Sequence, residues 1–331
     1  MVDKLIEGLK RNWFLLGIVA ALFLGFLVPS AEAVLNPGGF TRPVLIVLLF
    51  LISGFTLPSE AITAGLKDYR LHLYIQGFIF LFTPLFFVLT TLPLRTLWGQ
   101  QLLIGILALS VLPTTISSCI VFTQVSGGNV MGTMFNAALA NLIGVVVSPL
   151  LLSLLLRGAG APLPAGEVLR ILRSLGLQML APIACGQVLR QFFKATAGKH
   201  RKLLSVISNL FILLIVLFSF SGTARNPRFM DNLGTMVAPF GFLAVAHIAL
   251  LFLAYGGARL LGFSRENRIS VLFAAPQKTV AVGAPLLSTY FASNPELLGA
   301  ALLPLVFYHA WQLVAAGFVR SSRLVTIPEV R

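Results

Sequence analysis

Charge is scarce in this chain of 331 residues. Only 10% of the residues are charged, whereas 57% are hydrophobic and the mean hydropathy is +0.94. Soluble domains are typically about a quarter charged. This deficit excludes a soluble enzyme, a disordered tail and a nucleic-acid binder. The composition predicts an all-α polytopic membrane protein, with the lipid bilayer as its surroundings.

Cysteines and acidic residues are also few. The two cysteines lie in apolar runs and are too few for a disulfide framework or a zinc site. The ten acidic residues all fall in loops or at the ends of apolar runs. The chain also lacks a phosphate-binding loop, an HExxH motif and a nucleophile elbow. We therefore expect no enzyme, no metal site and no cofactor, with sodium left open.

Basic residues are the exception, since 24 Lys and Arg give a net charge of +14. They are spread over short loops and not gathered into one patch, which argues against a nucleic-acid partner. With a cytoplasmic N-terminus, 16 of them lie in inner loops and 7 in outer loops, and Lys278 lies inside an apolar run. This positive-inside bias predicts a multi-pass protein of the plasma (inner) membrane with both termini in the cytoplasm.

Ten apolar runs approach the roughly 20 residues that cross a bilayer as a helix. They are 13–29, 43–57, 72–93, 101–122, 131–156, 171–192, 203–222, 237–261, 269–290 and 298–318. The second run is short, and the fourth and ninth contain internal breakers. An alternative interpretation of the first run is a secretory signal, because a basic start precedes it and Ala31-Glu32-Ala33 resembles a cleavage site.

An internal repeat relates the two halves. Pro113-Thr114-Thr115-Ile116-Ser117-Ser118 in the fourth run and Pro276-Gln277-Lys278-Thr279 in the ninth are 163 positions apart. The same offset places the other four runs of the first half onto runs of the second half. Because five runs per half is an odd number, the halves have opposite orientation. We predict a single domain, 1–331, with repeats at about 10–157 and 170–320.

Inverted repeats with interrupted helices are typical of secondary transporters, which bind ions and substrates near the bilayer midplane. A proline removes a backbone donor, and in lipid the freed carbonyls must find other partners. The repeats therefore predict that the interruptions in the fourth and ninth helices cross there. Alternatively, each proline makes only a tolerated kink, as we expect for Pro84, Pro182 and Pro239.

Lys278 lies about 14 Å along the ninth run, too deep for its side chain to reach water. An ionisable group there costs at least about 2.5–3.5 kcal/mol. No carboxylate inside a run can pair with it, so carbonyls, amides, hydroxyls, water or an anionic ligand must do so. Lys278 could attract an anionic substrate or replace a bound cation, load and unload a proton, or serve only a structural purpose.

Other polar side chains complete the candidate substrate and ion site, which has no catalytic residues. They are Thr114, Thr115, Ser117, Ser118, Asn136, Gln277, Thr279, Gln76 and His309. Each has a plainer alternative, because serine often bonds to its own helix and amides often join helices. His309 could relay protons or only pack, and His247 is interpreted as packing. Gly127-Gly128-Asn129 is interpreted as a turn.

Several segments in a fixed order resemble the bile acid:sodium symporter family, most of all its branch related to solute carrier family 10 member 7. They are Lys10-Arg11-Asn12-Trp13-Phe14, Gly17-Ile18-Val19, Leu71-His72-Leu73 with Ile75-Gln76, Ser117-Ser118, Gly127-Gly128-Asn129, Phe135-Asn136, Ser148-Pro149-Leu150-Leu151, Gln277-Lys278-Thr279 with Gly283 and Pro285, and Tyr308-His309. The resemblance spans nearly the whole chain.

The resemblance implies ten helices in two inverted halves, with a core domain that moves against a panel domain. In the sodium-coupled branch, ions lie beside the crossing. Ser117, Ser118 and Gln277 match ligand positions there, whereas Phe273 stands where the family has a glutamate. Without that carboxylate, the resemblance implies proton coupling or uncoupled transport more than sodium coupling.

The function that follows is secondary active transport of a small organic anion by alternating access. A membrane-embedded sensor or regulatory protein that retains this fold is one alternative. A sodium-coupled symporter with an atypical ion site is the other. The sequence does not predict an oligomeric state.

Overall fold

The structure is a computed structural model that describes residues 13–57, 68–159, 164–225 and 239–320. Those residues form helices joined by short connections and contain no strand, which confirms the predicted all-α class. Part of the charge bias concerns residues outside these ranges. They are Lys4, Lys10, Arg11, Lys67, Arg228, Arg323 and Arg331.

Six stretches of helix are long and apolar enough to cross a membrane. They are Tyr69–Leu94, Val130–Gly158 (α10), Ala165–Phe192, Arg201–Ala224 (α14), Phe240–Leu260 (α17) and Pro295–Arg320 (α20). Shorter apolar helices are Trp13–Leu27 (α2), Thr41–Thr56 (α4), Gln100–Ser110 (α8) and Val280–Tyr290 (α19). The remaining elements are α3 (Ala31–Leu35), η1 (Pro37–Gly39), α9 (Ser117–Val125), α13 (Lys194–Lys199) and α18 (Arg265–Ala274).

The fourth and ninth runs are interrupted where the sequence predicts. Helix α8 ends at Ser110, and α9 begins at Ser117. Likewise, α18 ends at Ala274 and α19 begins at Val280. Pro113 and Pro276 lie in the non-helical segments between them, where their missing amide hydrogens cost no helical bond.

Two other prolines follow a wider helical turn. The stretch Tyr69–Leu94 consists of α6 (Tyr69–Gly77), a π-helical turn η2 (Phe78–Phe82), α7 (Thr83–Thr91) and η3 (Leu92–Leu94), with Pro84 at the start of α7. The stretch Ala165–Phe192 consists of α11 (Ala165–Leu175), a π-helical turn η4 (Gly176–Leu180) and α12 (Ala181–Phe192), with Pro182 at the start of α12. Pro239, in contrast, precedes the first residue of α17 and does not kink it.

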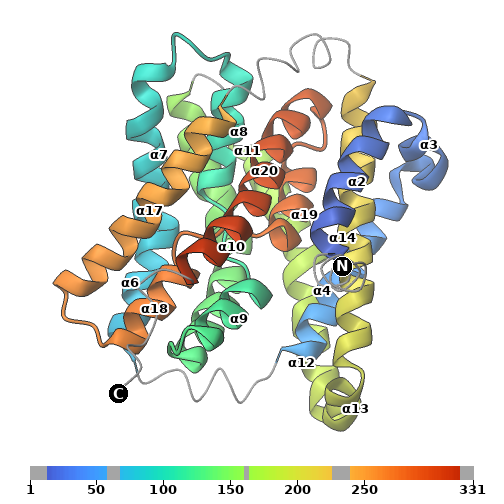
Figure 1. Ribbon diagram of the computed structural model, residues 1–331. Coiled ribbons are helices and arrows are strands. Elements are labelled where there is room, and N and C mark those ends of the chain that lie inside the picture. The colour runs from blue at the N-terminus through green and yellow to red at the C-terminus, as the bar shows by residue number, and fades with distance from the viewer. Residues whose placement is uncertain (1–12, 58–67, 160–163, 226–238, 321–331) are drawn as a thin grey trace, which may run out of the picture.

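The helices form two groups that stand side by side (Figure 1). In one group, α4 packs along α12 and α2 packs along α14. In the other, α8 packs along α20, and α17 contacts both α18 and α20. Contacts of α14 with α19 and of α10 with α11 connect the groups.

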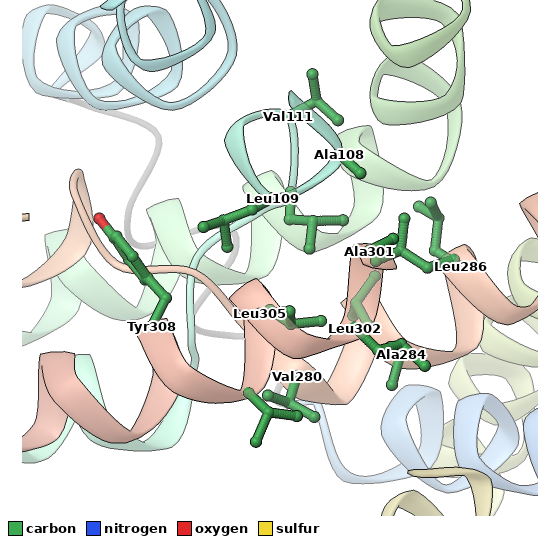
Figure 2. Packing of buried hydrophobic residues seen from close by; sticks show 14 of the residues in the cluster. Ala108, Leu109, Val111, Val280, Ala284, Leu286, Ala301, Leu302, Leu305 and Tyr308 are labelled. Carbon is green, nitrogen blue, oxygen red and sulfur yellow. The ribbon is translucent and has the colours of Figure 1, made fainter. Parts of the chain in front are cut away.

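The apolar core between α8, α19 and α20 holds the interrupted helices in place. Figure 2 shows Ala108 and Leu109 of α8 facing side chains of α19 and α20, whereas Val111, just after α8, lies farther from them. All three are fully buried. At Gly105, the backbones come so close that an added Cβ atom would meet the carbonyl of Ala300. Such approaches let dispersion forces hold helices together in lipid, where burial from water contributes little.

Helices α4 and α12 also meet through glycines. A Cβ atom added at Gly54 would meet the backbone of Ile183, and one added at Gly186 would meet the backbone of Leu51. We expect Gly186→Ala to lower the free energy of unfolding by about 1–3 kcal/mol, because a backbone atom cannot move aside as a side chain can. Thermal unfolding in detergent measures this change.

The matched control is Gly256→Ala, since the Cβ atom it adds on α17 would meet nothing within 4 Å. This control should be neutral or gain about 0.5–1 kcal/mol from better helix propensity. Equal midpoints for the two variants would show that the glycine contact between α4 and α12 is not needed.

Candidate functional site

The two interruptions touch each other. The backbone N–H of Thr279 donates to the carbonyl of Pro113 at 3.0 Å. The side-chain oxygen Oε1 of Gln277 accepts from the hydroxyl of Thr115 at 2.6 Å and from that of Ser118 at 3.1 Å. The structure thus brings together Thr115, Ser118, Gln277 and Thr279, four of the residues that the sequence selects.

The ammonium group of Lys278 lies in the same place and is completely buried. Its Nζ donates to the carbonyls of Ser110 at 2.7 Å and Leu112 at 2.8 Å. These carbonyls lie at the C-terminal end of α8, where helical partners are missing and the helix dipole is negative. Lys278 therefore binds where a cation is favoured, and its partners are carbonyls, one of the predicted kinds.

A third carbonyl, that of Ile79, lies 3.4 Å from the same nitrogen. The π-helical turn η2 explains why this carbonyl is available. Thr83 donates its N–H to Phe78, five residues back, so Ile79 would next need the N–H of residue 84. That residue is Pro84, which has no N–H. The proline and the wide turn together free the Ile79 oxygen for the lysine.

The backbone of Lys278 is held by the side chain of Gln312 in α20. The Lys278 N–H donates to Oε1 of Gln312 at 2.8 Å, and Nε2 of Gln312 donates to the Lys278 carbonyl at 2.7 Å. This pair fixes the orientation of the amide. Nδ1 of His309 lies 2.9 Å from the same Nε2 and 3.3 Å from the Lys278 carbonyl, so His309 belongs to this cluster as well.

Side chains of α10 and the second break satisfy the rest of the first break. Ser148 donates to the carbonyl of Val111 at 2.7 Å. Asn141 donates to the carbonyl of Thr114 at 2.9 Å. Together with Lys278 and Thr279, these donors give each carbonyl from residue 110 to residue 114 a partner.

Asn136 and Gln76 form a separate cluster between α10 and α6. Gln76 donates through Nε2 to the backbone and side-chain oxygens of Asn136, at 3.0 and 3.2 Å. Asn136 in turn donates to Gly132 at 2.8 Å and contacts Nδ1 of His72 at 2.9 Å. Within the described residues, no hydrogen bond joins Gln76 or Asn136 to the two interruptions. That Gln76 and Asn136 belong to the same binding site as the interruptions stays a prediction.

Three buried side-chain oxygens have no hydrogen-bond partner among the described residues: Oε1 of Gln76, Oγ1 of Thr114 and, just after the end of α9, Oγ of Ser126. Buried polar atoms are nearly always satisfied, so such atoms are candidates to contact an ion, water or substrate. Ser117 behaves differently from its neighbours, because its side chain is exposed at the first residue of α9 and does not face Gln277. Thr279 caps α19 by accepting from the N–H of Ala281 at 3.2 Å.

Tyr308 and Ser148 also form hydrogen bonds with the breaks, although neither residue was among the candidates selected from the sequence. Tyr308 donates to the carbonyl of Pro276 at 2.8 Å, and His247 contacts the Tyr308 hydroxyl at 2.9 Å. Ser148 donates to the carbonyl of Val111 in the first break, as described above. A proline break signals that carbonyls will need donors, but it does not indicate which distant side chain supplies them.

The position at which the resemblance implies a glutamate is apolar. Phe273 is completely buried, and its ring stacks on that of Phe122 with centroids 5.6 Å apart. Within the described ranges, no group of three or more His, Cys, Asp or Glu side chains lies close enough to hold a metal ion. The crossing therefore offers neutral oxygens and one ammonium group.

Comparison with known proteins agrees with this arrangement. Residues 12–322 match the model of the SBF-like CPA transporter family. The chain belongs to this family. An uncharacterized protein of Pseudomonas aeruginosa is 33% identical to it over 309 residues, covering 92% of this chain and 90% of that protein. The SBF-like family is one of transporters and not of enzymes, as the sequence predicts.

Animal cotransporters are also similar to this SBF-like chain. The sodium/bile acid cotransporter 7-B of Xenopus laevis is 29% identical over 321 residues, covering 94% of this chain and 91% of that protein. The sodium/bile acid cotransporter 7 of Rattus norvegicus is 28% identical over 321 residues, covering 94% and 92%. The predicted resemblance is confirmed, and with it a multi-pass membrane transporter that acts on small molecules.

The amide of Gln312 gives a test of the site's architecture. We expect Gln312→Leu to lower the free energy of unfolding by about 2–4 kcal/mol, because it leaves the N–H of Lys278 unpaired and removes the amide donor from the Lys278 carbonyl. Thermal unfolding in detergent measures this change. The control Gln178→Leu removes a half-buried amide whose hydrogen bond goes to Ser174 on its own helix. A control as unstable as Gln312→Leu would contradict the specific role of Gln312.

Proposed function

We propose that this protein is a secondary active transporter of a small organic anion that works by alternating access. The observation that carries the proposal is the contact of two interrupted helices around one buried ammonium group. Unwound segments at such a depth expose polar atoms that can bind a substrate and then change partners.

The proposed topology has ten membrane passes in two inverted halves, about 10–157 and 170–320. The six long stretches provide six passes, and α2 and α4 provide two more. The pairs α8–α9 and α18–α19 are the remaining passes, each interrupted in the middle. Lys and Arg bias supports a plasma (inner) membrane location with cytoplasmic termini.

Alternating access needs two bodies that move relative to each other, and the two groups of helices are candidates. The interrupted helices lie with α10, α17 and α20, whereas α2, α4, α12 and α14 form the other group (Figure 1). In this proposal the first group is the core domain and the second is the panel. The crossing faces the panel through the contact of α19 with α14.

The positive charge at the crossing favours an anionic substrate. Among the described membrane-spanning helices, no carboxylate neutralises Lys278. Helix α9 begins beside the crossing with no side-chain cap, and its first residue, Ser117, is exposed. Free N–H groups and the positive end of a helix dipole attract negative groups.

Sodium is the less favoured coupling ion. The Phe122–Phe273 stack occupies the place of the family's carboxylate, and the ammonium of Lys278 already contacts the carbonyls at the end of α8. A lysine in that place supports proton coupling or uncoupled transport. A sodium-coupled symporter with an atypical site is the alternative, supported by the unpaired oxygens of Gln76 and Thr114 and by the relatives' names.

A flux measurement tests the proposal. Protein in proteoliposomes should take up or exchange labelled organic anions, with bile acids among the compounds screened because two relatives are named for them. We expect Lys278→Ala to abolish flux while the protein still folds and inserts, and Ser118→Ala to lower it severalfold. Lys199→Ala changes an exposed lysine of α13 and should leave flux unchanged. Ligand binding without any flux would favour the sensor or regulatory protein.

The coupling ion is tested by thermal unfolding in sodium or potassium chloride at several pH values. A cation present at ten times its dissociation constant would stabilise the fold by about 1.4 kcal/mol. We expect no gain with sodium, because an ammonium group already occupies the cation-binding end of α8. A sodium-specific rise in the midpoint that Thr114→Val removes would instead support the atypical sodium site.

A further inference from the structure

A cavity of about 260 Å³ lies between the end of α10 and the start of α11, away from the crossing. Its lining residues are Leu150, Ser153, Leu154, Arg157, Ala165 and Val168. Leu150, Leu154 and Arg157 follow each other at helical spacing along one side of α10, and all three are exposed. Two exposed leucines thus lie in line with an exposed arginine on the same side of α10.

The depth of these residues matches the layers of a bilayer. Arg157 is in the last turn of α10, at an end of a helix long enough to span the membrane. Leu150 lies seven residues earlier, about 10 Å deeper at the rise of an α-helix. A phospholipid has the same arrangement, with a phosphate at the interface and an acyl chain beneath it.

No side chain in the described part of the protein pairs with the guanidinium of Arg157. Among the described residues, the one ion pair joins Arg42 and Glu32, and no hydrogen bond is formed by the Arg157 side chain. Glu167, the acidic residue next to Val168, does not pair with it. An arginine has five N–H donors and binds phosphate with two of them at once, which a lysine cannot do.

We propose that an anionic phospholipid binds in this cavity, with its phosphate on Arg157 and an acyl chain along Leu150, Leu154 and Val168. Basic pockets between membrane helices bind lipid headgroups in this way. Ser153, which lines the cavity, is buried and makes a 2.7 Å hydrogen bond with the hydroxyl of Tyr290, the last residue of α19. The lipid would therefore lie one hydrogen bond from an interrupted helix.

The position also connects the two groups of helices. Helix α10 packs on α9 and α18, whereas α11 continues through η4 into α12, which packs on α4. A lipid held between α10 and α11 would have to be accommodated whenever the two groups move. This consequence for transport rests on the proposed function, whereas lipid binding does not.

Binding is tested on the full chain in detergent, by native mass spectrometry and by thermal unfolding. Phosphatidylglycerol, phosphatidylethanolamine and soluble glycerol phosphate are titrated separately. We expect phosphatidylglycerol to be retained and to raise the unfolding midpoint. Arg157→Ala should weaken its apparent affinity about tenfold. Ala165→Phe, which fills the cavity while keeping the arginine, should weaken it too.

The matched control is Arg170→Ala, because Arg170 is exposed on α11 but does not line the cavity. It should bind phosphatidylglycerol as the unmodified protein does. Equal losses in the two arginine variants would overturn the proposal, as would equal binding of phosphatidylethanolamine. Full binding of glycerol phosphate would show a site for a soluble anion instead. None of these results depends on flux, so the transporter proposal is tested independently.

Discussion

Every backbone carbonyl freed by a helix interruption must find a donor inside the bilayer, because water is not available there. In this protein the donors for the first break come from elsewhere in the chain. Lys278 and Thr279 in the second break supply some of them, and Ser148 and Asn141 in α10 supply others. The first break therefore depends on the second break and on α10 for its hydrogen-bond donors. This single requirement explains why the two breaks cross and why α10 packs beside them. It also explains why Gln312 forms hydrogen bonds with the backbone of Lys278.

Much of this arrangement was predictable because prolines, charges and apolar runs act locally. The missing N–H of Pro113 and Pro276 indicates the two interruptions, and the depth of Lys278 indicates that it needs polar partners, with carbonyls among the predicted kinds. The offset between the two prolines predicts that these features belong together, and the contact of Thr279 with Pro113 agrees. The resemblance to the symporter family predicts the same helices.

Other features depend on three-dimensional proximity that no local pattern contains. The Ile79 carbonyl is free only because the turn before Pro84 is π-helical, whereas the sequence indicates a simple kink there. Ser148 and Tyr308 reach the breaks from other helices. Ser117 and Ser118 are adjacent in sequence, yet only Ser118 faces Gln277, because successive residues of a helix point about 100° apart.

A positive charge that belongs to the polypeptide differs from a dissolved ion in one respect. Lys278 is covalently attached, so its local concentration is the same whatever the medium contains, and it cannot leave with the cargo. Such a group can hold the end of α8 together for as long as it keeps its proton. It cannot by itself draw energy from a difference in salt across the membrane, which only a particle that crosses can do.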